Sequence, residues 1–489
     1  MRVLIRADAG ATIGIGHVAR CLTLAEQLVA QGATVVFACR ELPGHQLGRI
    51  AAEGHEVLAL PADAEDEIAA LAARLPPGVV FDWIIVDHYA LGAAWERGAR
   101  RWARRIMVID DLADRAHDCD LLLDQNATAS EATYQLLVPA ACRVLAGPRY
   151  AVLRPAFRQG AAPAADGPQR VLVSFGGFDQ GGMTLKTLQA LMSIDGIEVQ
   201  CIAGQSSPDL PALQALVSQR PGWQLLAFVD DLARRMAGAT LFIGAGGGTV
   251  WERAALGVPS LCVSVADNQT ANAEVLARAG VHLYLGAAAQ VSVEALRQAI
   301  ALLLDNAPLR EHFAERGRQW VDGLGAQRVA VALLGQGLRL RAVAFEDARL
   351  LFDGRNAAAV RHASLQQAPL EWEAHCRWLQ ATLGNDQRLL LIGEAGDGAV
   401  GMLRYDRLGA SRARVSLYLF EGRMGLGWGR ALLSAGEGAL LRQWPQVQVI
   451  EAQVLTGNQA SLGLFRGAGY IQSECHFERL LKDSQHEQF

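Results

Sequence analysis

The sequence predicts an α/β protein in which two Rossmann-like domains precede a smaller α+β domain. The chain has 489 residues, which is too many for one hydrophobic core and suggests about three domains. Through residues 1–335, short apolar runs alternate with helical patterns, as in parallel sheets covered by helices on both faces. Glycine-rich turns follow several of these runs, at the strand ends where such sheets bind ligands.

The composition indicates a folded protein and argues against several classes of partner. Hydrophobic residues make up 51% of the chain and the formal net charge is −5, so no nucleic-acid surface is indicated. No apolar stretch reaches the length of a membrane span, and the first residues do not resemble a signal peptide. The eight cysteines are scattered without a Cys-x-x-Cys pair, which favours a reducing, cytoplasmic compartment and no metal site. The oligomeric state is not indicated.

The first predicted domain covers residues 1–155. A loop containing Gly14 and Gly16 follows its first apolar run, and His17 comes directly before a helical pattern. A histidine at a helix N-terminus is disfavoured as imidazolium, so it can accept a proton near neutral pH. It could equally cap the helix or be buried between domains. The further strands are expected at 33–39, 83–87 and 105–110.

Two pairs of polar residues end strands of this domain. Asp87 and Tyr89 follow the strand at 83–87 and should face the same edge of the sheet as His17. Tyr89 could bind the substrate or orient a water molecule, although a simple strand-end turn explains the pair equally well. Asp110 and Asp111 are a weaker candidate, because paired acids often only cap a helix.

The second predicted domain covers residues 166–335 and follows a Pro- and Gly-rich linker at 154–170. Three polar or glycine-rich loops come after its expected strands, at 174–182, 244–252 and 267–269. Free N–H groups at a helix start suit a diphosphate, and an acid in the first helical turn can accept hydrogen bonds from a ribose. Each loop alone could be a tight turn, but together they favour a nucleotide-sugar site. Its candidate residues are Gly176, Gly177, Gly247, Gly248, Thr249, Glu252, Asn268 and Gln269.

These loops and this layout resemble known enzymes. The two-domain arrangement resembles the GT-B fold, and the loops are similar to those of the N-acetylglucosaminyltransferases that make lipid II. The stretches at 6–25, 84–89, 108–126 and 147–157 resemble the UDP-sugar hydrolases of pseudaminic acid biosynthesis. That resemblance implies that His17 is the general base for water. Gly14 and Gly16 leave room for the substrate near the backbone, and two facing α/β domains would share one cleft. No Asp-x-Asp motif lies in a nucleotide loop, so no metal is expected.

The third predicted domain covers residues 342–489. Strands are expected at 400–408, 414–420 and 447–455, with a glycine-rich turn and helix at 421–441. That turn and the stretch at 455–470 resemble the two cofactor motifs of GNAT acetyltransferases, which implies binding of acetyl-CoA. The implied residues are Leu419, Gly425, Gly427, Gly429, Arg430, Asn458 and Phe465.

The third domain departs from the GNAT pattern at two positions. Met424 stands where the family has Arg or Gln, and Phe465 replaces a frequent tyrosine that protonates the leaving thiolate. Water or Tyr470 could act instead. His375 could lie near the acceptor or could only pack a helix.

Together these resemblances imply a bifunctional enzyme of pseudaminic acid biosynthesis. The C-terminal domain would acetylate the 4-amino group of a UDP-4-amino-4,6-dideoxy-N-acetyl-altrosamine, and the N-terminal pair would hydrolyse the product to UDP and a free 2,4-diacetamido sugar. A GT-B glycosyltransferase remains an alternative, as does a UDP-sugar-binding module with an inactive GNAT domain. A related nonulosonic acid pathway would use the same loops.

Overall fold

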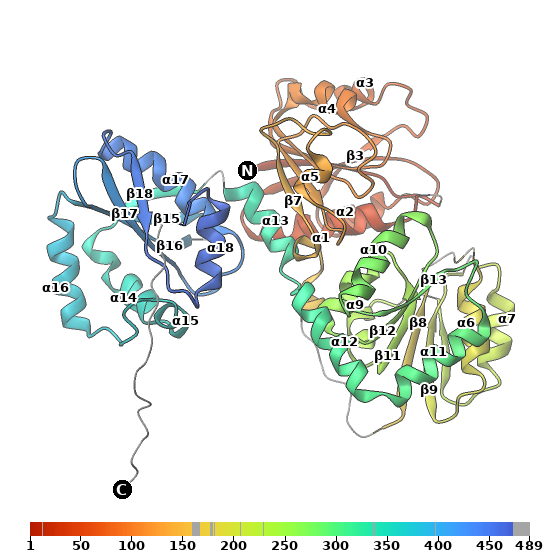
Figure 1. The fold of residues 1–489 in the computed structure, drawn as a ribbon. Helices are drawn as coiled ribbons and strands as arrows, with labels where there is room; N and C mark the ends of the chain where they lie inside the picture. The colour runs from red at the N-terminus through yellow and green to blue at the C-terminus, as the bar shows by residue number, and fades with distance from the viewer. Residues whose placement is uncertain are drawn as a thin grey trace, which may run out of the picture. The chain divides into compact units, whose positions relative to one another are not determined.

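The computed structural model describes residues 1–11, 13–158, 167–176, 179, 181–205, 207–227, 229–335, 338–396 and 398–472. The chain divides into two compact units, Met1–Leu333 (unit 1) and Leu334–Phe489 (unit 2) (Figure 1). Unit 1 contains two parallel α/β sheets and unit 2 contains a mixed sheet.

The first sheet of unit 1 has the strand order β3-β2-β1-β4-β5-β6-β7, and all its pairs are parallel. Its central strands are buried almost throughout, as their continuous apolar sequences predict. The strands are β1 (Arg2–Ala7), β2 (Thr34–Arg40), β3 (Glu56–Leu60), β4 (Phe81–Asp87), β5 (Ala103–Ile109), β6 (Leu121–Asp124) and β7 (Arg143–Ala146). The helices are α1 (Gly16–Ala30), α2 (Leu47–Ala52), α3 (Glu67–Ala72), α4 (Ala93–Ala99) and α5 (Glu131–Tyr134).

The second sheet has the order β10-β9-β8-β11-β12-β13 and is also parallel. Its strands are β8 (Gln169–Ser174), β9 (Ile197–Ile202), β10 (Trp223–Leu226), β11 (Leu241–Ala245), β12 (Ser260–Ser264) and β13 (Leu283–Ala287). The helices are α6 (Met183–Leu191), α7 (Leu210–Val217), α8 (Leu232–Ala237), α9 (Thr249–Leu256), α10 (Asp267–Arg278), α11 (Val293–Asp305), α12 (Ala307–Trp320) and α13 (Gly325–Leu334). In each sheet the order reverses beside the first strand, at β1/β4 and at β8/β11, which is where open α/β sheets bind ligands.

The last helix of the predicted second domain contacts the first domain. The indole Nε1 of Trp83 in β4 donates to the carbonyl oxygen of Leu333 in α13, at 3.2 Å. Arg328 of α13 donates to the carbonyl oxygen of Arg149 at 2.7 Å. The last helix of the second predicted domain therefore packs against the first domain before unit 2 begins at Leu334.

Unit 2 has the order β14-β15-β16-β17-β18, antiparallel except for the parallel pair β17/β18. Its first strand already lies at Arg339–Ala342, slightly before the expected start at 342. The strands are β14 (Arg339–Ala342), β15 (Arg388–Ala395), β16 (Gly398–Arg407), β17 (Arg412–Leu419) and β18 (Val449–Ala452). The helices are α14 (Ala348–Asn356), α15 (Ala358–His362), α16 (Trp372–Leu383), α17 (Trp428–Gln443) and α18 (Gln459–Gly467).

The backbone of β11 lies too close to β8 for any side chain at Gly244. A Cβ atom there would lie 2.2 Å from the carbonyl oxygen of Ser174 and 2.6 Å from the ring of Phe242. We expect Gly244→Ala to lower the free energy of unfolding of unit 1 by about 1–3 kcal/mol, as overpacked cores do. Chemical denaturation of the full chain measures this. Gly48→Ala, in open space on α2, is the control and should keep or raise stability; equal behaviour of the two variants would contradict the close approach.

Candidate functional site

The loop that follows β1 brings His17 to the end of β4. Gly10 and Gly14 exchange backbone hydrogen bonds at 3.2 and 2.8 Å, and Gly14 has a φ of 80°, a left-handed conformation that favours glycine. Gly16 is the first residue of α1, and a Cβ atom there would meet nothing within 4 Å. Because β1 and β4 are neighbours in the sheet, His17 and Asp87 lie at the same strand end.

A buried carboxylate joins His17 to Arg20. Nδ1 of His17 lies 2.6 Å from Oδ1 of Asp87. Arg20 donates Nε and Nη2 to the two oxygens of the same carboxylate, at 2.9 and 2.7 Å. Asp87 is fully buried and His17 is 7% exposed. Burial alone would raise the pKa of Asp87, but Arg20 and His17 hold that pKa below its usual range, so the carboxylate is ionised and accepts from Nδ1. With its proton on Nδ1, the imidazole has its lone pair at Nε2, as a general base requires.

Tyr89 and Asp111 complete this group of side chains. The Tyr89 ring meets the His17 ring edge-on, with centroids 4.6 Å apart, and its hydroxyl donates to Oδ2 of Asp111 at 3.3 Å. Burial, followed by the charge of Asp111, raises the pKa of Tyr89 to about 12, so the hydroxyl stays protonated. Oδ1 of Asp111 is buried without a hydrogen-bond partner among the described residues. Asp111, the weaker candidate from sequence, therefore lies beside the predicted base.

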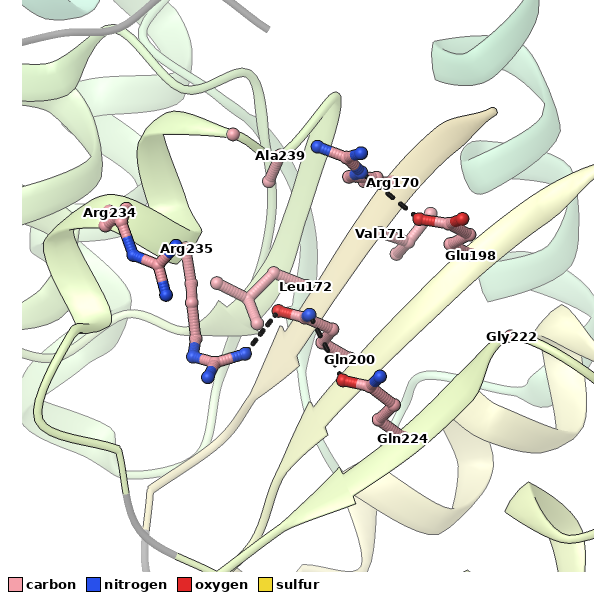
Figure 2. A pocket seen from close by; sticks show the side chains of 11 residues that line it. Arg170, Val171, Leu172, Glu198, Gln200, Gly222, Gln224, Arg234, Arg235 and Ala239 are labelled. Atoms are coloured by element: carbon pink, nitrogen blue, oxygen red, sulfur yellow. Dashed lines mark hydrogen bonds and ion pairs between the residues drawn. The ribbon is translucent and has the colours of Figure 1, made fainter. Parts of the chain in front are cut away.

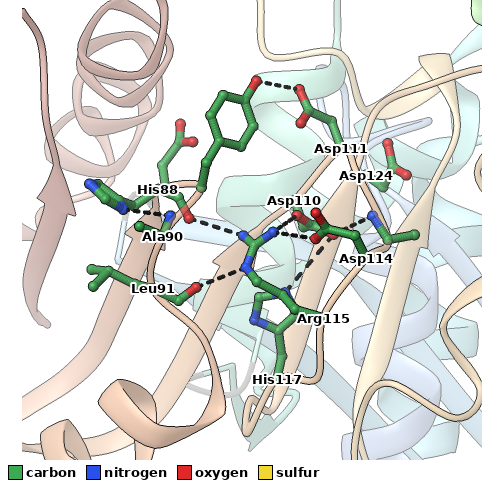
Figure 3. Close-up of polar contacts among 12 residues, drawn as sticks. His88, Ala90, Leu91, Asp110, Asp111, Asp114, Arg115, His117 and Asp124 are labelled. Atoms are coloured by element: carbon green, nitrogen blue, oxygen red, sulfur yellow. Dashed lines mark hydrogen bonds and ion pairs between the residues drawn. The ribbon is translucent and has the colours of Figure 1, made fainter. Parts of the chain in front are cut away.

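Asp110 has a structural role instead, in the turn between β5 and β6 and not as the cap of a helix. Its Oδ2 accepts from the backbone of Ala113 at 2.9 Å and from the hydroxyl of Tyr134 at 3.1 Å. Arg115 lies 3.1 Å from its Oδ1 and donates to the carbonyl oxygens of His88 and Leu91 (Figure 3). Arg115 thus connects the loop after β4 to the loop after β5 and fixes the segment that carries Tyr89.

A second group of buried charged side chains holds the loop after β4 against the end of β1. Arg6 donates to Oδ1 of Asp8 at 2.6 Å, and Nε2 of His88 lies 3.2 Å from Oδ2 of Asp8. The backbone N–H of Ala90 donates to Nδ1 of His88 at 3.0 Å, so the His88 proton is on Nε2 and points to Asp8. His88 therefore joins the end of β1 to the loop after β4 and does not face the predicted substrate.

In the second sheet, the three predicted loops follow β8, β11 and β12, which are neighbours. Gln269 braces two of them, because its Oε1 accepts from the backbone of Gly246 at 3.2 Å and of Val265 at 3.1 Å. A Cβ atom added at Gly247 would lie 3.5 Å from Nε2 of Gln269, whereas one added at Gly248 would meet nothing within 4 Å. Gln269 therefore supports the loops through its Oε1, and the ligand contact predicted for it stays a prediction.

The other predicted residues of this site lie before or at the starts of α6, α9 and α10. Gly176 has a φ of 94°, Thr249 is the first residue of α9, and Asn268 is exposed in the first turn of α10. Gly177 lies outside the described residues. Asp179, not predicted, caps α6 by accepting from the backbones of Met183 and Thr184.

Glu252 is a buried carboxylate of these loops. It lies in the first turn of α9, and its Oε2 is buried with no hydrogen-bond partner among the described residues. Burial raises the pKa of Glu252 to about 7, with Arg154 and Arg253 acting in the opposite direction. An unpartnered buried acceptor costs free energy, so the position suits a hydroxyl donor such as a ribose.

A hollow of about 300 Å³ opens on the second sheet away from these loops. It is lined by the first halves of β8, β9 and β10, and its polar side chains pair with each other (Figure 2). Arg170 pairs with Glu198, and Arg235 donates to Gln200. The hollow therefore does not coincide with the predicted nucleotide site.

The predicted coenzyme loop of unit 2 has two glycines in left-handed conformations, Gly425 with a φ of 75° and Gly427 with a φ of 98°. Gly427 directly precedes α17, whose first N–H groups lack helical acceptors. Gly429 instead allows α17 to approach α18, since a Cβ atom there would lie 3.0 Å from Leu464. Leu419 ends β17, and Arg430 is exposed on α17.

The remaining candidates of unit 2 have clear packing or capping roles. Asn458 caps α18 by accepting from the backbone of Ser461 and donates to the carbonyl oxygen of Ala363, both at 3.0 Å. Phe465 contacts the Tyr470 ring edge-on, with centroids 5.0 Å apart. The Tyr470 hydroxyl is buried, and burial followed by Glu437 raises its pKa to about 12.

His375 packs a helix, which was one of its two predicted roles. It is 4% exposed, and its Nε2 lies 3.1 Å from the carbonyl oxygen of Ala348. Its ring also contacts the rings of Phe352 and Trp378.

In the described part of the chain, no group of three or more His, Cys, Asp or Glu side chains could hold a metal ion. None of the helices described is both long enough and apolar enough to span a membrane.

Comparison with solved structures identifies the architecture of unit 1. MurG of Acinetobacter baumannii matches with a TM-score of 0.51 and 19% identity, over 68% of this chain and 98% of MurG. Arabidopsis thaliana UGT89C1, solved with UDP, matches with a TM-score of 0.51 and 13% identity, over 68% of this chain and 99% of that protein. Unit 1 has the GT-B fold. The predicted pair of Rossmann-like domains in a GT-B arrangement is thereby confirmed.

Sequence comparisons add relatives of this GT-B unit. Residues 185–318 match the glycosyltransferase family 28 C-terminal domain. The chain is 28% identical to the UDP-2,4-diacetamido-2,4,6-trideoxy-beta-L-altropyranose hydrolase of Campylobacter jejuni, over 57% of this chain and 97% of the hydrolase. It is 32% identical to the spore coat polysaccharide biosynthesis protein SpsG of Bacillus subtilis, over 39% of this chain and 58% of SpsG. An uncharacterized protein of Methanocaldococcus jannaschii, MJ1062, is 20% identical over 97% of both chains.

The raised pKa of Glu252 predicts a pH-dependent stability. The folded state holds the proton more tightly than the unfolded state, whose glutamate pKa is about 4.3. The stability contributed by this group is therefore complete below that pH and is lost as pH rises through about 7. Glu252→Gln should remove this loss, flattening the pH profile of unfolding free energy between these two values. Glu274→Gln, an exposed site on α10, should keep the original profile; a Glu252→Gln profile with the original slope would contradict the assignment.

Proposed function

We propose that the chain is a bifunctional UDP-sugar enzyme that acetylates a UDP-4-amino sugar and then hydrolyses the product to UDP and a free 2,4-diacetamido sugar. The observation that carries the hydrolytic half is the pairing of His17 with Asp87 at the switch point of the first sheet. The similarity to the Campylobacter jejuni hydrolase, which spans 97% of that enzyme, supports the same substrate class.

The hydrolytic step follows from the groups around His17. Nε2 of His17 takes a proton from water while the water oxygen attacks the anomeric carbon of the sugar. The bond from that carbon to the diphosphate oxygen breaks, and its electron pair leaves with UDP. N–H groups at the start of α9 stabilise the charge that develops on the diphosphate. Asp87 holds Nδ1 and stabilises the imidazolium that forms, and Arg20 keeps Asp87 ionised.

Acetyl transfer is proposed for unit 2 with acetyl-CoA as co-substrate. The helix start after Gly427 suits a diphosphate. The strand β18 pairs with Arg412–Val415, the first half of β17. Among the described residues no strand pairs with that edge of the second half, which suits an extended ligand such as the pantetheine arm. An acetyltransferase beside a hydrolase would join consecutive steps on one sugar nucleotide.

A glycosyltransferase is the second candidate. The match of residues 185–318 to the glycosyltransferase family 28 C-terminal domain favours it. A one-pot assay with UDP-4-amino-4,6-dideoxy-N-acetyl-β-L-altrosamine, with and without acetyl-CoA, separates the candidates. UDP released only with acetyl-CoA supports the proposal. An acetylated product that keeps its UDP contradicts hydrolysis and favours a transferase or a binding module.

His17→Asn tests the base directly. The amide cannot take a proton from water, so UDP release from the pre-acetylated UDP-sugar should fall by about 10²–10⁴-fold, the usual contribution of a general base. Calorimetric titration with UDP should give an unchanged Kd. His45→Asn, at an exposed histidine of the same domain, should behave as wild type. Normal turnover by His17→Asn would remove His17 from the mechanism.

A further inference from the structure

Four buried arginine nitrogen atoms in unit 2 have no hydrogen-bond partner among the described residues. Two of them are Nη1 of Arg355 on α14 and Nε of Arg361 on α15. Arg355 donates its Nη2 to the carbonyl oxygen of Gln366 at 2.7 Å, and neither arginine forms an ion pair with a carboxylate among the described residues. Buried donors without acceptors are rare in folded proteins and call for an explanation.

Arg404 is a third arginine near Arg355 and Arg361. Arg404 of β16 forms an ion pair with Asp406 at 2.9 Å, and Asp406 is shared with Arg388 at 3.3 Å. Tyr418 pairs with Met402 in the β16/β17 register, two residues from Arg404 on the same face of the sheet, and its hydroxyl bonds to α14. The three arginines therefore come from neighbouring elements. Burial lowers the pKa of Arg355, Tyr418 opposes this, and the positive charges of Arg361 and Arg404 lower it further. One shared carboxylate does not balance the three arginines. Such a group is stable when an anion completes it.

The cluster lies beside the second half of β17, which has no second strand partner in the described part of the chain. The Tyr418 hydroxyl donates to the carbonyl oxygen of Leu351 at 3.0 Å, and Gly354 lies against Tyr418 and Phe420. The end of α15 is fixed by the bond from Asn458 to Ala363. The arginines thus come from α14, α15 and β16, whereas the glycine-rich turn predicted for the coenzyme precedes α17.

We propose that Arg355, Arg361 and Arg404 bind the diphosphate of the nucleotide-linked acceptor in unit 2. This rests on the proposed acetyl transfer and names how its substrate is recognised. Guanidinium groups offer paired N–H donors that match phosphate oxygens, and a diphosphate carries enough negative charge to balance the excess. Unit 2 would then select a sugar nucleotide and reject the free amino sugar.

Arg355→Gln and Arg361→Gln test the site. Each should raise the KM for the UDP-4-amino sugar about tenfold or more, since a hydrogen bond between charged groups is lost, and should leave the KM for acetyl-CoA unchanged. Arg377→Gln, at an exposed position on α16, is the matched control and should change neither KM. A rise in the acetyl-CoA KM alone would show that the arginines bind coenzyme phosphates and would overturn the proposal.

A binding measurement on the full chain decides independently of acetyl transfer. UDP should slow hydrogen–deuterium exchange in peptides covering 350–366, uridine should not, and Arg361→Gln should abolish the effect. Equal exchange with and without UDP, or equal protection by uridine, would refute the diphosphate site. If wild-type protein transfers no acetyl group but UDP still protects these peptides, the proposed function fails and the anion site stands.

Discussion

The N-terminal site depends on one buried carboxylate, that of Asp87. It lies at the end of β4 with no exposed surface and accepts hydrogen bonds from both His17 and Arg20. Because an isolated buried charge is costly, the carboxylate and its two partners hold one another in place. The order of β1 and β4 in the sheet, the glycine loop between β1 and α1, and the ion pair of Asp8 with His88 all serve to bring these groups to one edge.

The candidate nucleotide site in unit 1 and the arginine cluster in unit 2 also contain buried polar atoms, and these have no hydrogen-bond partner among the described residues. Glu252 has a buried acceptor and Arg361 has a buried donor, and neither has a partner in the described protein. Folding has brought both out of water without the hydrogen bonds that would offset that cost. In each case a ligand of opposite hydrogen-bonding character would satisfy them: hydroxyl donors at Glu252 and phosphate oxygens at the arginines. The two units are thereby consistent with recognition of different parts of a sugar nucleotide.

Much of this arrangement could be predicted from the sequence, because parallel α/β sheets have a strong periodic signature. The long buried strands β1, β4 and β11 appear as apolar runs, whereas β6 and β7, with four residues each, are too short to distinguish from loops. Arg20 was missed, although it follows His17 by three residues and so shares its helix face. Long-range packing could not be predicted from the sequence. Two examples are the contact of α13 with strand β4 of the first sheet and the close approach of Gly429 to Leu464.

Hydrolysis of the UDP-2,4-diacetamido sugar in H₂¹⁸O tests the central claim most directly. If water activated by His17 attacks the anomeric carbon, mass spectrometry will find the label in the free sugar and none in UDP. Label in the phosphate of UDP would show that water attacks phosphorus, and the arrangement of His17 and Asp87 would then have been assigned to the wrong bond. Absence of UDP release until an acceptor is added would show that unit 1 transfers the sugar.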